Sequence, residues 1–165
     1  MKLLLFAISA FIALALCGCA TALLDRGYDE SALQASKNPE LAKCRFMAID
    51  EKNDTSKEMK YDCVLAEAAL SNNTKLCDYA PTFTIYGTYG TKFYSIDSCN
   101  KDIWRCEHVF RAVARSGQIH EIDAKRRDIY DSCGNDLMFY LLTYGTEDDA
   151  KALRDSRAGL NYSDS

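Results

Sequence analysis

The sequence has few of the residue types and motifs that mark a catalytic site. It contains only two histidines, His108 and His120, in 165 residues. A zinc site needs at least a third protein ligand, and no spacing in the sequence places one beside this pair. The motifs G-x-S-x-G and H-E-x-x-H and the glycine-rich phosphate loop do not occur. We therefore interpret the two histidines as surface or capping residues, and we expect neither enzyme activity nor a metal or other cofactor.

Basic residues are also too few for a nucleic-acid partner. The chain has 20 lysines and arginines against 24 acidic residues, and loss of Lys2 with a leader would leave 19, which takes the net charge from −4 to −5. Binding to a phosphate backbone needs a basic face. The short cluster Lys125-Arg126-Arg127 is surrounded by acidic residues and is typical of a solvated helix face.

The amino-terminal apolar run is too short for a permanent membrane span. It extends from Leu3 to Leu16, follows Lys2 and is interrupted only by Ser9. Its length of about 14 residues is below the roughly 20 that a membrane-spanning helix requires. A basic start, an apolar middle and small residues at the end are the layout of a secretory signal.

The end of this run resembles the lipobox of bacterial lipoproteins. The residues are Leu16-Cys17-Gly18-Cys19, although that family usually has Ala, Ser or Thr where this chain has Cys17. The resemblance implies that residues 1–18 are a lipoprotein-type signal peptide and that Cys19 is lipidated. The protein would then be anchored in the cell envelope, on the extracytoplasmic side of the membrane. Cleavage after Ala20-Thr21-Ala22 is the alternative, and it would give a soluble secreted protein.

Beyond this processing site the number of cysteines is even, and none of the intervals is a C-x-x-C spacing typical of metal sites. In an oxidising compartment, these cysteines are expected to form three disulfides. They are Cys44, Cys63, Cys77, Cys99, Cys106 and Cys133.

Turn positions select one pairing of these cysteines. Cys99 and Cys106 lie on one predicted helix, about 10.5 Å apart along its axis, which exceeds the roughly 7 Å limit for a disulfide. In an antiparallel hairpin, residues equidistant from the turn lie opposite each other. The midpoints of 44 and 63, of 77 and 99, and of 106 and 133 fall at Asn53-Asp54, at Thr88 and just after Gly117, all in or beside predicted turns. We therefore predict Cys44–Cys63, Cys77–Cys99 and Cys106–Cys133.

Helix-capping residues and apolar spacing predict a mainly all-α, disulfide-stapled domain over residues 38–158. A polar tether (19–37) precedes it and a flexible tail (159–165) follows. The expected helices cover residues 38–51, 56–70, 98–115, 122–133 and 146–157, with short helical turns at 76–77 and 137–142. The expected core consists of Leu41, Met47, Met59, Leu70, Ile103, Phe110, Val113, Leu137 and Leu141.

Residues 82–95 differ in composition and predict the one β-hairpin. β-Branched and aromatic residues flank a centre bounded by Gly87 and Gly90, which suit a tight turn. Only one side of such a hairpin can pack on the helices, so some aromatic side chains are expected to stay exposed. The alternative is that both sides are covered and the tyrosines bond to nearby backbone. The candidate partner-binding residues are Tyr86, Tyr89, Phe93 and Tyr94.

The segment from Tyr86 to Gly90 also resembles the calcium loop of secreted phospholipases A2. In that family a following helix carries a Cys-Cys-x-x-His-Asp motif with the catalytic histidine. Here the following helix reads Cys99-Asn100-Lys101-Asp102 and lacks both the histidine and the cysteine pair. The first hypothesis is thus a non-enzymatic, extracytoplasmic protein-binding or inhibitor module with an unknown protein partner. A hydrolase or metal-dependent enzyme of the envelope is the alternative. Sequons at Asn53, Asn72 and Asn161 matter only in a cell that glycosylates secreted proteins.

Overall fold

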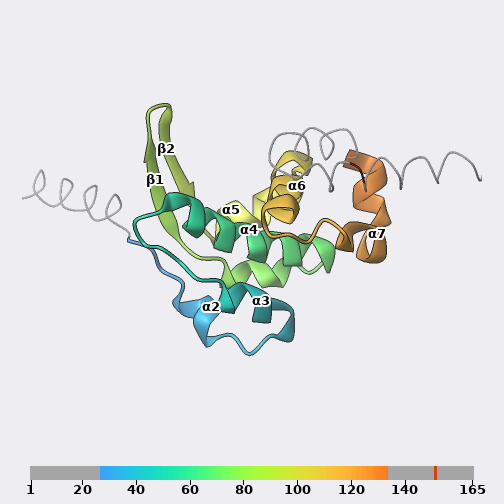
Figure 1. The fold of residues 1–165 in the computed structure, drawn as a ribbon, viewed down its shortest axis with the longest axis horizontal. Helices are drawn as coiled ribbons and strands as arrows, with labels where there is room; N and C mark the ends of the chain where they lie inside the picture. Colours follow the sequence, from blue (N-terminus) through green and yellow to red (C-terminus); the bar gives the residue numbers. More distant parts are fainter. Residues whose placement is uncertain (1–26, 134–150, 152–165) are drawn as a thin grey trace, which may run out of the picture.

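The computed structural model describes residues 27–133 and residue 151. As predicted, the domain is mainly helical with one two-stranded antiparallel hairpin (Figure 1). Residues 127–133 are also helical. In chain order the elements are α2 (Ser31–Ala35), the 3-10 helix η1 (Pro39–Leu41), α3 (Ala42–Phe46), α4 (Asp54–Leu70), the 3-10 helix η2 (Thr74–Tyr79), β1 (Phe83–Gly87), β2 (Gly90–Tyr94), α5 (Ile96–Asp102), α6 (Cys106–Arg115) and α7 (Glu121–Lys125).

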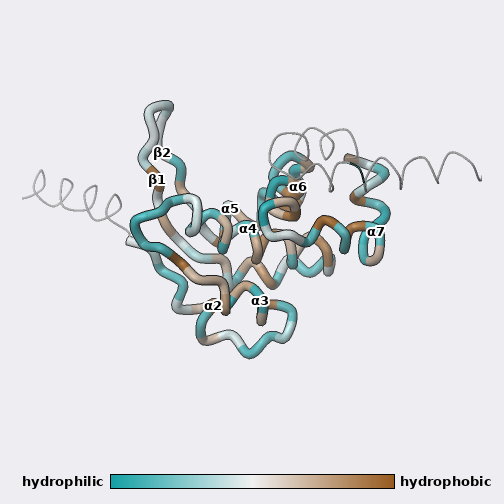
Figure 2. Tube along the Cα trace, in the orientation of Figure 1, coloured by the Kyte–Doolittle hydropathy of each residue, from teal (hydrophilic) through white to brown (hydrophobic). Residues whose placement is uncertain are grey.

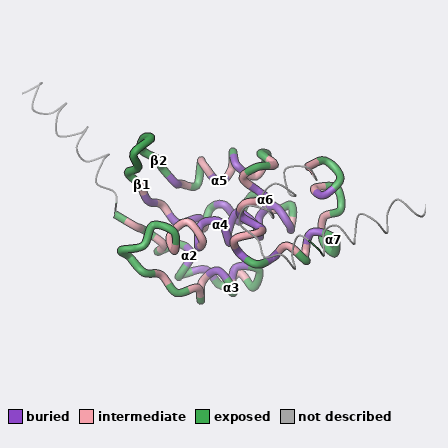
Figure 3. The backbone as a smooth tube through the Cα atoms, turned by 45° about the horizontal axis from the view of Figure 1, so that its top comes forward, coloured by how far each residue is buried: buried purple, intermediate pink, exposed green. Residues whose placement is uncertain are grey.

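Helix α4 lies at the centre of the domain. Every residue from 60 to 70 is buried, and the other elements surround this part of the helix (Figure 3). Burial on α4 is therefore not confined to one face of the helix. Met59, which we expected in the core, is only half-buried. Leu41, Leu70, Phe110 and Val113 are buried as predicted. Met47 and Ile103 are partly buried and pack against the core, whereas Leu137 and Leu141 lie outside the described residues.

Helix α4 begins at Asp54, two residues before the predicted start at residue 56. The side chain of Asn53 caps the helix, since its Oδ1 accepts a hydrogen bond from the backbone N–H of Thr55 at 3.0 Å. Glu58 is used elsewhere and contacts two other elements. The preceding helix is also shorter than predicted, because α3 ends at Phe46 rather than near Glu51.

The predicted helix 98–115 is broken into α5 and α6. The backbone turns between Asp102 and Arg105, where the N–H of Arg105 donates to the carbonyl oxygen of Asp102 at 2.9 Å. The break allows Asp102 to turn inward, where its carboxylate lies 3.4 Å from the hydroxyl of Tyr61 and 2.9 Å from Nδ1 of His108. A single straight helix was therefore the wrong prediction, although α6 ends as predicted before Gly117, whose φ is +69°.

The predicted tether is wrong for residues 27–37, because this segment is packed into the fold. Leu33 in α2 is fully buried. Asp29 and Thr82 exchange two backbone hydrogen bonds of 2.9 and 2.8 Å, which join the segment to the residue before β1. Glu30 and Lys60 form an ion pair of 2.6 Å. The ordered domain therefore begins earlier than the apolar pattern indicated.

Three disulfides confirm the pairing predicted from the turn positions. Cys44–Cys63 joins α3 to α4, and Cys77–Cys99 joins η2 to α5. Cys106–Cys133 joins the start of α6 to the helical segment 127–133. The Cα atoms are 5.5 to 5.6 Å apart, within the usual range. Three disulfides indicate an oxidising, extracytoplasmic environment.

The structure describes only part of the region for which carboxy-terminal helices were predicted. The predicted helix 122–133 is interrupted at Arg126, between α7 and the segment 127–133. The predicted signal peptide, Cys19, Asn161, the segments 137–142 and 146–157 and the tail lie outside the described residues, apart from residue 151. Within the described part of the chain, no helix has the length and apolar character needed to cross a bilayer.

Candidate binding surface on the hairpin

The hairpin projects from the helical body (Figure 1). Phe83 pairs with Tyr94, Ile85 with Lys92 and Gly87 with Gly90, so the turn consists of the residues predicted for it. Gly90 has a φ of +131°, a conformation that residues with a side chain rarely adopt. Residues 86–93 are all exposed, and the outer half of the hairpin is green in Figure 3.

One side of the hairpin base belongs to the core. The rings of Phe83 and Tyr94 are stacked with centroids 4.5 Å apart, and Tyr61 of α4 meets Tyr94 edge-on at 4.9 Å. Tyr94 is only 2% exposed. The prediction that Tyr94 contacts a partner is therefore wrong, because the alternating sides of the strand place it against α4.

The other predicted aromatics remain on the surface. Tyr86 is 62% exposed, Phe93 is 45% exposed and Tyr89, in the turn, is fully exposed. Phe93 pairs with Thr84 and Tyr86 pairs with Thr91, so Tyr86 and Phe93 are diagonal neighbours on the side opposite Tyr94. We call Tyr86, Tyr89 and Phe93 the aromatic face. Hydropathy alone does not reveal it, since the hairpin tip is pale in Figure 2.

A polar cluster fixes the hairpin base to α4 and α6. The Tyr94 hydroxyl donates to the carboxylate of Glu58. Nη1 of Arg115 lies 2.8 Å from Oε2 of Glu58 and 3.3 Å from Oδ2 of Asp62. Nη2 of Arg111 lies 3.6 Å from Oδ1 of Asp62. These contacts hold the strands in place, and Tyr86, Tyr89 and Phe93 remain exposed on the surface.

The two carboxylates of this cluster have pKa values shifted in opposite directions. Burial raises the pKa of Asp62, and the charges of Arg111 and Arg115 offset this only in part. Burial also acts to raise the pKa of Glu58. Hydrogen bonds from Tyr94 and Arg115 outweigh it, so the pKa of Glu58 lies below its ordinary value. Glu58 is therefore the ionised carboxylate that accepts the hydrogen bond of the Tyr94 hydroxyl.

Tyr94→Phe is expected to lower the free energy of unfolding by about 1 to 2 kcal/mol, because the Glu58 carboxylate loses a donor. The pKa of Glu58 is lowered in the folded state, so its ionised form contributes its full stabilisation at pH values above the unfolded pKa. That stability is lost as pH falls through the folded pKa. The difference from wild type should thus shrink in acid. Urea unfolding at about pH 7 and about pH 3 measures it. Tyr89→Phe, at a fully exposed position, is the control, and equal losses in both variants would contradict the assignment.

The histidines lie apart from the aromatic face. Nδ1 of His108 in α6 is 2.9 Å from Oδ1 of Asp102, whose other oxygen is 3.4 Å from the Tyr61 hydroxyl. His120 is exposed and occupies the position before α7, where its side chain makes no capping hydrogen bond. The sequence analysis missed the contact between Asp102 and His108, because it placed both residues on one unbroken helix. Among residues 27–133 and 151, no three metal-ligating side chains come together.

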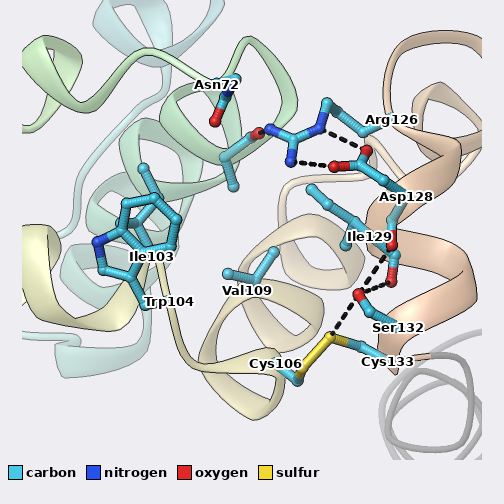
Figure 4. Close-up of a pocket in the computed structure, with 11 residues that line it drawn as sticks. Asn72, Ile103, Trp104, Cys106, Val109, Arg126, Asp128, Ile129, Ser132 and Cys133 are labelled. Atoms are coloured by element: carbon cyan, nitrogen blue, oxygen red, sulfur yellow. Dashed lines mark hydrogen bonds and ion pairs between the residues drawn. A yellow bond between two sulfur atoms is a disulfide. The ribbon is translucent and has the colours of Figure 1, made fainter.

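A hollow of about 230 Å³ lies between the α5–α6 turn and the residues after α7 (Figure 4). Ile103, Val109 and Ile129 give it an apolar lining. The guanidinium of Arg126 binds both carboxylate oxygens of Asp128 at 2.7 and 2.6 Å, so the charged groups at its edge pair with each other. The disulfide-bonded Cys106 and Cys133 line this hollow, whereas the predicted partner-binding residues Tyr86, Tyr89, Phe93 and Tyr94 do not.

Comparisons with known protein families, with curated proteins and with solved structures find no match to this chain. The case for function therefore depends on the geometry of the domain. Two of the three sequons lie in the described residues, and both asparagines are exposed. Asn53 caps α4, and Asn72 follows the end of α4 and has a φ of +53°.

Proposed function

We propose that this protein is a non-enzymatic, extracytoplasmic protein-binding or inhibitor module that contacts a partner protein through the aromatic face. The observation that carries the proposal is the exposure of Tyr86, Tyr89 and Phe93 beside a firmly packed hairpin base. Tyrosine offers a large apolar area and a polar tip, and its few rotatable bonds keep the entropy loss on binding small. A rigid base lowers that loss further.

The proposal also includes a membrane anchor at Cys19. The lipobox pattern supports lipidation, and the described domain begins at residue 27, so a lipid at Cys19 would place it close to the membrane surface. Mass spectrometry of the mature amino terminus tests this part separately. A diacylglycerol-modified Cys19 is expected, whereas an unmodified terminus after Ala22 would favour the secreted form.

Double substitution of Tyr86→Ala and Tyr89→Ala is expected to weaken partner capture at least about tenfold, because aromatic residues at the centre of an interface supply much of its affinity. The tagged domain is used to capture proteins from an envelope and extracellular extract of the source cells, followed by quantitative mass spectrometry. Phe46→Ala is the matched control, since Phe46 is 84% exposed in α3 and lies outside the hairpin. The melting temperatures of all three proteins should agree closely.

If the wild type and the double variant capture the same proteins equally well, the aromatic face has no role in binding. The proposal also fails if the wild type and Phe46→Ala capture no protein in common. Unfolding of the double variant would show that the tyrosines are structural, against their exposure of 62% and more.

The alternative of a hydrolase has one supporting observation, the contact between His108 and Asp102. A carboxylate that positions a histidine is a common arrangement in acid–base catalysis. The test is hydrolytic activity and metal content of the wild type compared with the double variant His108→Ala, His120→Ala. Activity that is lost in this variant, with the fold retained, would favour the enzyme over the binding module.

A further inference from the structure

A second hollow lies at the junction of β2, α5 and α6, next to the base of the hairpin. Its volume is about 200 Å³. Nitrogen-bearing side chains from all three elements line it, namely Lys92 from β2, Lys101 from α5, His108 from α6 and Arg105, which immediately precedes α6. The chain as a whole carries a net charge of −4, so this concentration of basic groups is local.

Two of these basic groups have their charges unpaired within the described part of the chain. The side chains of Lys101 and Arg105 are exposed and form no hydrogen bond or ion pair with any described residue. Arg115, in contrast, is paired with both Glu58 and Asp62. Lys101 and Arg105 are thus available to a ligand from solution.

Asp102 is the one acidic residue among the described residues that line the hollow. One of its carboxylate oxygens lies 2.9 Å from Nδ1 of His108 and the other 3.4 Å from the hydroxyl of Tyr61. The two oxygens therefore contact His108 and Tyr61, and Asp102 forms no ion pair with the described side chains of Lys101 and Arg105.

Lys92 lies over the ring of Tyr94, with its Nζ 4.9 Å from the ring centroid, and has charged groups of both signs around it. Its Nζ lies 4.0 Å from the nearest oxygen of Glu58, a distance at the outer limit of an ion pair. Burial and the positive charges of Arg111 and Arg115 lower the pKa of Lys92, although Glu58 and Asp62 act in the opposite direction. A bound anion would relieve this repulsion.

We propose that this hollow binds a phosphate or sulfate group. Such a group carries charge on several oxygens, and amino and guanidinium groups contributed by β2, α5 and the residue before α6 can each donate to a different one. The guanidinium of Arg105 is suited to two of these oxygens at once. Phe93 of the aromatic face also lines the hollow, but the inference is argued from the basic side chains and does not depend on the proposed function.

The test is isothermal titration of the full domain with sodium phosphate and with sodium sulfate at low ionic strength, with sodium chloride at matched ionic strength as the blank. Saturable binding of phosphate or sulfate beyond the chloride blank is expected. In the double variant Lys101→Gln, Arg105→Gln the affinity should fall at least tenfold. Neither side chain has a described partner, so the fold should be retained.

The matched control is Lys75→Gln, Arg127→Gln, which removes the same two charges from η2 and from the segment 127–133. This variant should bind phosphate like the wild type. A further titration with glycerol phosphate separates the two sources of the oxyanion. Tighter binding than inorganic phosphate would assign the hollow to a phosphate ester, and weaker binding would assign it to the free ion.

Heats no larger than those with chloride would overturn the proposal, because they would mean that the basic groups attract only a diffuse ion atmosphere. Equal losses of affinity in the two double variants would also overturn it. As an independent readout, the ring signals of His108 should shift on phosphate addition in the wild type and remain unchanged in Lys101→Gln, Arg105→Gln.

Discussion

Arg115→Met is expected to lower the free energy of unfolding by about 3 kcal/mol at neutral pH. The substitution keeps the apolar stem but removes the cation between Glu58 and Asp62. The side chain of Asp62 has no exposed surface, and without Arg115 its charge is left with the longer contact to Arg111, at 3.6 Å. Removing one partner of a buried ion pair is destabilising, because the remaining charge is then poorly compensated. We expect a loss at the low end of the range for buried ion pairs, because the side chains of Arg115 and Glu58 are still 22% and 17% exposed.

Urea unfolding at about pH 7 and about pH 4 checks this expectation. Burial already raises the pKa of Asp62, so the stability of the folded state falls as pH rises from its unfolded pKa to its folded pKa. Without Arg115 the folded pKa rises further and this range widens. Glu58, whose pKa is lowered, loses its stabilising contribution in acid in both proteins. The difference between variant and wild type should therefore be smaller at the lower pH.

Lys57→Met is the control for this experiment. Lys57 pairs with Asp54 at 3.0 Å on the same helix α4, but Asp54 is half-exposed, so the expected change is below about 1 kcal/mol. Asp62→Asn in the Arg115→Met background should recover part of the lost stability, since it removes the stranded charge. Strict additivity of the two substitutions would show that the cost has another origin.

Removal of a disulfide has the second large expected effect. Cys77→Ala, Cys99→Ala opens a loop with a sequence separation of 22 residues, and the chain-entropy model gives a loss of about 3.4 kcal/mol. Alanine avoids placing a hydroxyl at these sites, which are both fully buried. Thermal and urea unfolding measure the loss.

The bridge between Cys106 and Cys133 supplies the comparison. Its sequence separation of 27 residues gives about 3.5 kcal/mol in the same model, slightly more than the other bridge. Cys106 and Cys133 are only half-buried, however, so their sulfur atoms contribute less packing. We therefore expect Cys77→Ala, Cys99→Ala to be less stable than Cys106→Ala, Cys133→Ala. If Cys106→Ala, Cys133→Ala is instead the less stable, loop length decides and packing of the sulfur atoms is unimportant.

Local features of the fold could be predicted because local chemistry determines them. The hairpin turn follows from Gly87 and Gly90, and the end of α6 follows from Gly117. The disulfide pairs were predicted correctly although one premise was wrong, since Cys99 and Cys106 lie on different helices. The turn positions were sufficient, because each bridge joins segments that are neighbours in the sequence.

The break between α5 and α6 could not be predicted from local sequence. Ile103-Trp104-Arg105 contains neither glycine nor proline, and the apolar spacing continues across it. The reason for the break is tertiary, since it lets Asp102 meet Tyr61, which is 41 positions earlier. In the same way, the burial of Leu33 depends on contacts with distant parts of the chain.

The candidate sites also combine features that local sequence predicts with features that depend on distant contacts. Alternation along a strand predicted that some hairpin aromatics would stay exposed, but it did not say on which side Tyr94 would lie. The basic hollow was missed because Lys92 comes from a different element from the other three basic groups. The spacing of Lys101, Arg105 and His108, at steps of four and three, was a signal that could have directed attention to it.

The order of the three disulfides along the chain affects how the domain can mature during export. The loops 44–63, 77–99 and 106–133 follow one another without overlap or crossing. A chain that enters the oxidising compartment amino end first can therefore close each bridge with the cysteine that preceded it, as soon as the second cysteine emerges. Oxidation between successive cysteines would produce the native connectivity directly, so this domain should need an oxidase for maturation but little help from a disulfide isomerase.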